Sequence, residues 1–273
     1  NNIVTYDKTI GEHHFNILAG QEAYSYRYDE LSASRTKMAL PDMPELVVGS
    51  QLTGGSGYRI DYALAGYFTQ LLYDYQSKYF FSASYRRDGS SRFAPGHRWG
   101  IFPAVGGAWY VSHEKFFEPV QKVISTLKLR ASYGRTGNDQ LGETRFPYQE
   151  AMNTDAGGLN LGISGISNGN AQNWFGGLSE NRAYYANLRW EIEDKTNIGF
   201  DLGLLNGQLD LSMDYFSNRR KDILITRNTV PSMSGLQSNP TQNYGIVSNK
   251  GVDGNLTFKQ HVGCLLYTSD AAD

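Results

Sequence analysis

The chain has 273 residues, of which 40% are hydrophobic, and its formal net charge is −2. This charge gives no indication of nucleic-acid binding, and no apolar run approaches the roughly 18 residues of a membrane-spanning helix, which excludes a helical membrane protein. A mean hydropathy of −0.47 does not exclude a membrane β-barrel, because its strands alternate between apolar and polar faces. The 19 Tyr, 13 Phe and 30 Gly residues suit strands, membrane interfaces and tight bends.

Two strands are predicted at the beginning of the chain, Val4–Tyr6 and Phe15–Tyr26, joined by the short connection Lys8–Glu12. The opening residues NNIVTYDK show no signal peptide. A polar loop of nearly thirty residues is predicted for Asp29–Gly57, because it contains two prolines and the run GGSG.

An alternation of period two predicts a second hairpin, with strands over residues 60–69 and 81–86 and a tight turn at Asp74–Lys78. The polar, glycine-containing segment Arg87–Arg98 is predicted to be a loop.

Trp99–Val111 is predicted to be a strand whose terminal aromatic residues, Trp99 and Trp109, would suit the interface belts of a membrane protein. Pro103 cannot donate a ladder hydrogen bond, so it requires a bulge or a local break in pairing. The apolar spacing in Ser112–Thr126 predicts one short amphipathic helix.

The second half of the chain begins with a predicted strand at Leu127–Tyr133. The longest irregular region is expected at Arg135–Arg182, followed by a strand approach at Tyr184–Trp190. A further loop at Asn228–Asn243 precedes a last strand at Val252–Phe258.

Asn197–Leu224 contains the clearest hairpin. Apolar side chains alternate with glycine, serine and carboxylate on both sides of Asn206-Gly207, a strong hairpin signal because both residues tolerate positive φ. Each arm has the roughly 9–11 residues that a tilted strand needs to cross a bilayer, and Tyr215-Phe216 would form an aromatic girdle. A half-buried hairpin of a soluble β-sandwich would show the same alternation.

The lengths of the connections separate these alternatives. Short or compact connections alternate with long ones along the whole chain, as expected for an outer-membrane barrel but not for a sandwich. The short ones are Lys8–Glu12, Asp74–Lys78, Ser112–Thr126 and Leu205–Gln208, and the long ones are Asp29–Gly57, Arg87–Arg98, Arg135–Arg182 and Asn228–Asn243. The prediction is an all-β chain, a partial antiparallel transmembrane β-barrel of about nine strands, with Asp201, Asp210 and Asp214 facing a wet lumen.

The last ten residues form a separate case. Cys264–Asp273 can be back-translated into a sequence that resembles the transposase mosaic-end adapter of sequencing libraries. We therefore expect residues 1–263 to be the barrel domain and residues 264–273 to be adapter read-through, although ten native residues could match by chance. The remaining sequence would then hold no cysteine and no disulfide framework.

Four motifs together resemble the SusC/RagA family of TonB-dependent outer-membrane transporters. They are SYRRDGSSRFAPGHRWGIFPAVGGAWYVSHEKFF (Ser84–Phe117), LKLRASYGRTGNDQLG (Leu127–Gly142), NLRWEIEDKTNIGFDLGLLNGQLDLSMDYFSNRRKDIL (Asn187–Leu224) and NYGIVSNKGVDGNL (Asn243–Leu256). The resemblance implies a 22-stranded barrel in the bacterial outer membrane, with an N-terminal plug. It also implies a SusD-like surface lipoprotein as partner, energy from TonB–ExbB–ExbD, and import of glycans, oligosaccharides or peptides. Plug, TonB box and closing strand are expected to lie outside this sequence.

Candidate functional residues are few, and no catalytic, cofactor, metal or substrate residue is assigned. Arg86, Arg87, Asp88 and Arg92 could bind a ligand, but a salt-bridged loop base is the expected role. Trp174 could stack on a sugar ring, although a lone loop aromatic residue is more often a packing anchor.

Other chemical signatures are weak. His13 and His14 are adjacent, so on a strand they point to opposite faces and cannot share a metal. Gly162–Ile166 lacks the final glycine of a nucleophile elbow. Asp210 and Asp214 are four residues apart on one strand and are interpreted as pore lining. We expect no enzyme; the alternatives to a transporter are a passive porin or adhesive barrel and a soluble carbohydrate-binding β-sandwich.

Overall fold

The computed structural model describes residues 1–273 except 41, 44, 142–145, 147, 150, 161–173, 183–184, 230, 232, 234–238, 263–264 and 273. One antiparallel sheet has ten strands in the order β1-β2-β3-β4-β5-β6-β9-β10-β11-β12, and β7 and β8 form a second, two-stranded sheet. The strands are β1 (Asn2–Ile10), β2 (His13–Met38), β3 (Gly49–Tyr75), β4 (Tyr79–Ser90), β5 (Trp99–Tyr110), β6 (Ile124–Asn138), β7 (Ala151–Asn160), β8 (Trp174–Arg182), β9 (Glu191–Leu204), β10 (Leu209–Thr226), β11 (Thr241–Val262) and β12 (Leu265–Ala272). The all-β partial barrel is confirmed, with ten strands in the main sheet rather than about nine.

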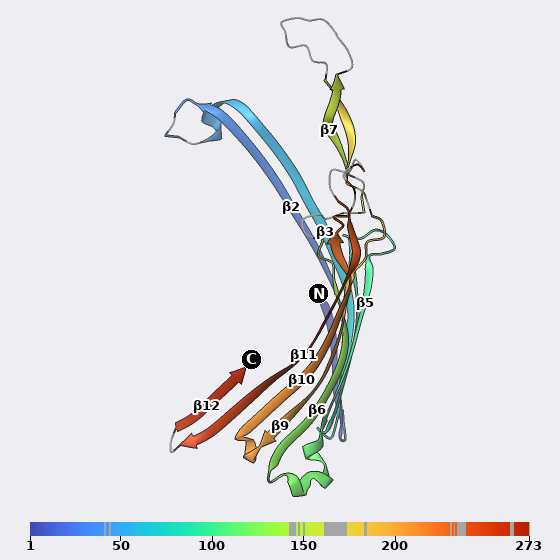
Figure 1. The fold of residues 1–273 in the computed structure, drawn as a ribbon, viewed down its shortest axis with the longest axis vertical. Coiled ribbons are helices and arrows are strands. Elements are labelled where there is room, and N and C mark those ends of the chain that lie inside the picture. Colours follow the sequence, from blue (N-terminus) through green and yellow to red (C-terminus); the bar gives the residue numbers. More distant parts are fainter. Residues whose placement is uncertain are drawn as a thin grey trace, which may run out of the picture.

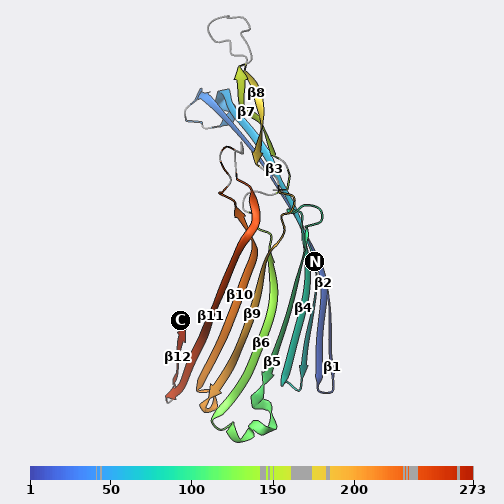
Figure 2. The same ribbon diagram turned by 45° about the vertical axis from the view of Figure 1, so that its right-hand side comes forward.

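The main sheet is an open, curved wall (Figure 1). Its short connections all lie at one end of the strands, here called the short-turn end, and its long connections lie at the opposite, long-loop end (Figure 2). The connections predicted to be short or compact therefore share one end of the sheet, but their lengths do not alternate strictly, because the β5–β6 connection (residues 111–123) is longer than the β2–β3 connection (residues 39–48). Residues 265–272 pair with β11 as β12, and the division expected at residue 263 stays a prediction.

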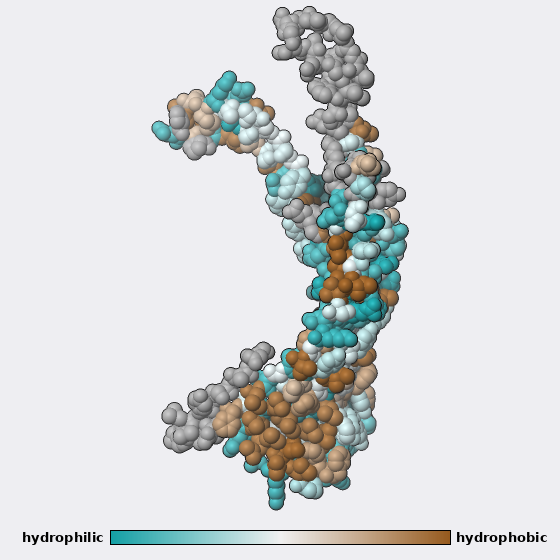
Figure 3. Space-filling view, in the orientation of Figure 1, coloured by the Kyte–Doolittle hydropathy of each residue, from teal (hydrophilic) through white to brown (hydrophobic). Residues whose placement is uncertain are grey.

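The sheet has two chemically different faces, because residues directly opposite in antiparallel strands project to the same side. On one face Met213 pairs with Phe200, and on the other Ser212 pairs with Asp201. Apolar side chains gather near the short-turn ends of β6, β9 and β10 in the space-filling view (Figure 3). No second layer of protein covers this apolar face in the described part of the chain, and Ile198 on it is 57% exposed. We call this the outward face, and the polar face, around which the sheet curves, the inward face.

Some apolar residues of the alternating strands lie on the inward face. The apolar residues of the 60–69 segment, such as Leu64 and Phe68, pair with Ser90 and Arg86 and so belong to the inward face. Phe216 also belongs to the inward face, where its ring lies against Gly251, so only Tyr215 of the predicted girdle faces outward. These strands continue beyond the apolar band, and there apolar residues need not face outward.

The predicted loop Asp29–Gly57 is wrong, because β2 and β3 continue as one long hairpin that pairs from His13 and Tyr75 to Met38 and Gly49. Cross-strand contacts hold this extension together. Arg27 pairs with Asp61 at 2.9 Å. Glu30 accepts hydrogen bonds from two tyrosine hydroxyls, each at 2.8 Å. Only residues 39–48 connect the strands, with the 3₁₀ helix η1 (Leu46–Val48); the two prolines at 41 and 44 lie outside the described residues.

The predicted amphipathic helix at Ser112–Thr126 is replaced by two 3₁₀ helices, η2 (Val111–His113) and η3 (Lys115–Val120). Pro119 lies inside η3 and has no N–H for a longer helical ladder. Phe117 is buried, whereas Phe116 is 66% exposed. None of the described helices is long and apolar enough to cross a membrane.

Pro103 marks the predicted break in pairing. It lies opposite Tyr85 on the β4 side, but on the β6 side the ladder begins only at Ala104. Beyond Pro103, a small hydrophobic core packs beside β5. It is formed by Phe93, Phe102, Leu188 and Trp190. The predicted strand approach at Tyr184–Trp190 is therefore wrong, because this segment supplies core residues instead and β9 begins at Glu191.

The predicted irregular region Arg135–Arg182 contains more strand than expected. β6 continues to Asn138, and β7 and β8 form a separate hairpin at the long-loop end. Trp174 is the first residue of β8, but its side chain lies outside the described residues, as does the whole of Gly162–Ile166. The hairpin of β9 and β10 is confirmed, with η4 (Leu205–Gly207) as its turn, and Asn206 has a φ of 58°.

Candidate functional site: the inward wall

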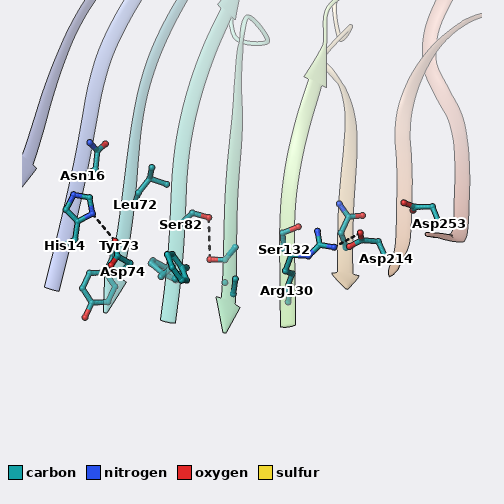
Figure 4. A pocket seen from close by; sticks show the side chains of 17 residues that line it. His14, Asn16, Leu72, Tyr73, Asp74, Ser82, Arg130, Ser132, Asp214 and Asp253 are labelled. Atoms are coloured by element: carbon teal, nitrogen blue, oxygen red, sulfur yellow. Dashed lines mark hydrogen bonds and ion pairs between the residues drawn. The ribbon is translucent and has the colours of Figure 1, made fainter. Parts of the chain in front are cut away.

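The inward face carries most of the polar chemistry of the sheet. Near the short-turn end it is hollowed over about 720 Å³, with side chains contributed from β2 across to β11. Figure 4 shows this hollow, with His14 and Asp74 on one side and Arg130 and Asp214 on the other. The hollow forms where small residues occupy inward positions of β4 and β5, namely Ser82, Gly106 and Ala108.

Arg130 joins three strands at the centre of this wall. One guanidinium nitrogen, Nη2, donates to Asp201 Oδ1 at 3.0 Å, to Ser212 Oγ at 3.1 Å and to Asp214 Oδ2 at 2.9 Å. Ser212 Oγ in turn donates to Asp201 Oδ1 at 2.7 Å. The Nε of Arg130 is buried and has no partner in the described part of the structure. A single cation thus binds two carboxylates across β6, β9 and β10.

Asp210 and Asp214 lie on the inward face, as the pore-lining interpretation requires. Asp214 bonds to Arg130, whereas Asp210 lies 3.0 Å from Lys259 Nζ on β11. Each carboxylate therefore has its own cation. Their separate partners do not fit a paired-carboxylate catalytic site.

His13 and His14 point to opposite faces, as predicted. The ring of His13 faces outward, where its Nδ1 lies 2.8 Å from the Tyr73 hydroxyl. His14 faces inward between Asp74 at 2.9 Å and Asp7 at 3.3 Å. Within the described ranges, no group of three or more His, Cys, Asp or Glu residues is arranged to hold a metal ion.

The four charged residues of the β4 end are divided between two faces. Arg86 faces inward and pairs with Glu22 and with Asp88, the latter at 2.7 Å. Arg92 lies 3.3 Å from Asp139, which also accepts a hydrogen bond from Ser90. These ion pairs form the expected salt-bridged loop base.

Arg87 belongs to the other face of the same strand. Its guanidinium carbon lies 4.8 Å from the ring centroid of Trp99, which stacks with Tyr67. It therefore does not contribute to the inward wall.

Glu114 lies at the short-turn end, in the segment that joins β5 to β6, and it binds aromatic residues of the outward face. Its carboxylate accepts hydrogen bonds from the Tyr79 hydroxyl at 2.6 Å and from Trp109 Nε1 at 3.3 Å, and Lys78 Nζ lies 3.4 Å away. The hydrogen bond from Tyr79 is the largest of the effects that hold the pKa of Glu114 below its usual value. The carboxylate of Glu114 thereby fixes the side chains of Tyr79 and Trp109 at this end of the sheet.

The inward wall presents many hydrogen-bond donors and acceptors over a broad curved surface. Such a surface suits a polar solute or a polar protein segment enclosed by the wall. The outward face, with its apolar band between aromatic residues, suits lipid.

Comparison with known proteins gives the family. Residues 2–272 match the family model described as "TonB dependent receptor-like, beta-barrel". The chain belongs to this family. Its members are receptors and transporters, not enzymes.

The curated relatives include the TonB-dependent receptor SusC of Bacteroides thetaiotaomicron, 30% identical over 94% of this chain and 24% of that protein. TonB-dependent receptor P3 of Formosa agariphila is also 30% identical, over 92% of the chain and 24% of that protein. This chain therefore spans about a quarter of the length of these relatives. The resemblance to the SusC/RagA family is confirmed.

Solved structures agree. The structure of the RagAB peptide transporter matches with a TM-score of 0.78 and 27% identity, covering 95% of this chain and 27% of that chain. The outer membrane transporter YddB from Escherichia coli shares the fold, with a TM-score of 0.61 and 11% identity over 95% of this chain and 30% of that chain.

Two features of the wall were missed by reasoning from the sequence. The role of Arg130 is one, and the only available signal was its alternation with apolar residues in the β6 segment. The core around Phe102 and Trp190 is the other. A signal for it existed, because Phe102 is the one large residue on its side of the strand between Gly100 and Ala108, where the other residues are glycine or alanine.

Proposed function

We propose that this chain forms part of the barrel wall of a SusC/RagA-type transporter in the bacterial outer membrane, which imports glycans, oligosaccharides or peptides. The observation that carries the proposal is the separation of the two faces. The outward face is apolar and aromatic, and the inward face is a hollowed wall of ion pairs and hydroxyl groups. The similarity to SusC and to RagAB supports this function, and RagAB is a peptide transporter.

The proposal includes partners at both ends of the barrel. A SusD-like surface lipoprotein would cover the long-loop end, where the β2–β3 and β7–β8 hairpins project beyond the rest of the sheet (Figure 2). TonB–ExbB–ExbD would act at the short-turn end through a plug. Polar inward side chains such as Arg130 and His14 would then face the plug and the cargo.

Uptake by cells that carry the intact transporter tests this function. We expect labelled oligosaccharides or peptides to enter only when both TonB and the proton-motive force are present. Uptake that continues at the same rate after loss of TonB would instead indicate a passive porin, the second candidate. Sequencing the gene across codon 263 tests the proposed division between residues 1–263 and 264–273.

A further inference from the structure

A row of cations lies on the outward face, toward the long-loop end of the apolar band. We call it the cationic row. Its members come from four strands and are Arg87 on β4, Arg135 on β6, Arg219 and Lys221 on β10, and Lys250 on β11. The strand pairing places them on one face. Arg135 is opposite Asp194, and Asp194 is opposite Arg219. Ser217 lies two residues before Arg219 on the same face of β10, and it is opposite Lys250.

On β4, β6 and β10 each cation of the row lies beyond a tyrosine of the same strand. On β4 and β6 the same motif, Ala-Ser-Tyr-x-Arg, places an arginine two residues beyond Tyr85 and Tyr133. Residues two apart on a strand share a face, so each arginine lies above its tyrosine on the outward side. On β10, Arg219 lies four residues beyond Tyr215. The order from the short-turn end is therefore apolar band, aromatic belt, cationic row.

The row carries more positive charge than its neighbours neutralise. Asp194 is its one carboxylate within the described residues, and it binds Arg135 at 2.7 Å and Lys221 at 2.9 Å. Arg87, Arg219 and Lys250 are exposed and have no carboxylate partner among the side chains that the structure describes. The guanidinium carbon of Arg87 lies 4.8 Å from the centroid of the Trp99 ring, a contact that positions the guanidinium group without using its N–H groups as hydrogen-bond donors.

We propose that the cationic row binds the phosphate groups of lipid headgroups in the outer leaflet. This inference rests on the outer-membrane location proposed above. An aromatic belt marks the depth at which apolar chains end and headgroups begin, and the row lies directly beyond it. Guanidinium groups hold phosphate oxygens in a planar, bidentate geometry. The row faces away from the inward wall, so neither cargo nor plug reaches it.

Lipid binding by the intact transporter, purified and stripped of lipid, tests this inference. The decisive variant combines Arg87→Gln, Arg219→Gln and Lys250→Gln, the three cations without a carboxylate partner. Each cation near an anionic lipid surface strengthens binding roughly fivefold, so the triple variant should bind bisphosphorylated lipid A on the order of a hundredfold more weakly. Bound lipid is counted by native mass spectrometry, and stabilisation is followed as the shift in the melting temperature on adding lipid.

Three further arms identify the source of the effect. Lipid A without its phosphates and inorganic phosphate alone should each stabilise the wild type much less than bisphosphorylated lipid A. A charge-keeping variant, with Arg87→Lys, Arg219→Lys and Lys250→Arg, should keep most of the lipid binding.

A matched variant removes the same charge at the opposite end of the sheet, through Lys8→Gln, Lys115→Gln and Lys122→Gln. We expect it to bind lipid A as the wild type does. Equal lipid affinity of the wild type and the decisive variant, or equal stabilisation by dephosphorylated lipid A, would overturn the inference. If the decisive variant does not fold, the charge-keeping variant decides: the inference fails if its affinity for bisphosphorylated lipid A is no greater than for the dephosphorylated form. TonB-dependent uptake is measured separately, so loss of lipid binding with intact uptake refutes only the cationic row.

Discussion

Removing Arg130 should destabilise the inward wall more than any other single charge change in the hollow. Arg130→Met takes away the one cation that Asp201 and Asp214 share, and it leaves Ser212 without its guanidinium partner. Two carboxylates then face each other across adjacent strands with no nearby positive charge. Uncompensated charge of this kind is the usual reason that breaking an ion pair costs more than the pair contributed.

The expected magnitude follows from the exposure of the cluster. The side chains of Arg130, Asp201 and Asp214 are 33%, 33% and 26% exposed. Hydrogen bonds to charged groups contribute about 1.5–3 kcal/mol when desolvated, whereas exposed ion pairs contribute about 0–1 kcal/mol. The cluster lies between these limits, so Arg130→Met should lower the free energy of unfolding by about 2 kcal/mol.

Urea unfolding of the intact transporter in detergent, followed by tryptophan fluorescence, measures this cost. The matched control removes the whole cluster, through Arg130→Met together with Asp201→Asn and Asp214→Asn. It should recover to within about 1 kcal/mol of the wild type, because no unpaired charge remains. The reasoning is refuted if Arg130→Met unfolds at the same urea concentration as the wild type, or if the control is less stable than the single variant.

Three further predictions use other parts of the wall. A methyl group at Gly137 would overlap a neighbouring phenylalanine ring, whereas one at Gly107 meets only a backbone oxygen at 3.7 Å. Gly137→Ala should therefore lower the free energy of unfolding by about 1–3 kcal/mol, and Gly107→Ala should lower it much less. Urea unfolding measures both. Met213→Arg places a charge in the apolar band and should cost about 2–4 kcal/mol of folding free energy in lipid vesicles, whereas Ser212→Arg on the inward face should cost less. Hydrogen bonds from two tyrosine hydroxyls lower the pKa of Glu30 from 4.5, so their stabilisation is present above pH 4.5 and is lost as the pH falls through the lower pKa of the folded state. Amide exchange in the β2–β3 extension, corrected for its intrinsic pH dependence, should therefore accelerate in acid, and should change less with pH when both hydroxyls are removed.

The apolar band of the sheet could be predicted from the sequence because period-two alternation reports which side of a strand is apolar. This holds for the β9–β10 hairpin, where Phe200, Leu202, Leu211 and Met213 share one face. The same signal failed above the band. In Asp29–Gly57 the glycine and serine residues predicted a loop, but the strand there depends on partners in another segment, such as Arg59, which forms an ion pair with Asp29.

The candidate site could be predicted only as a polar lining. That Asp210 and Asp214 face inward follows from alternation, but which cation each binds depends on strand order and register. Arg130 is 71 residues from Asp201 and 84 from Asp214, and no local pattern connects them. The core of Phe102 and Trp190 has the same origin, because the β5–β6 ladder separates at Pro103 and a segment distant in sequence fills the space.

The net charge of −2 conceals a separation of charge between the two faces. The hollow of the inward wall is lined by Asp74, Asp214 and Asp253 but by one guanidinium, that of Arg130. The cationic row on the outward face holds five cations and one carboxylate. A strand that alternates every residue can carry opposite charge on opposite sides without changing the total, so composition alone could not show this. In the proposed transporter, the excess of carboxylates in the hollow would favour basic or neutral polar groups in the segment of the plug that lies against it. The excess of cations outside favours anionic headgroups, so one alternating pattern sets both the lining of the barrel and its fit to the membrane.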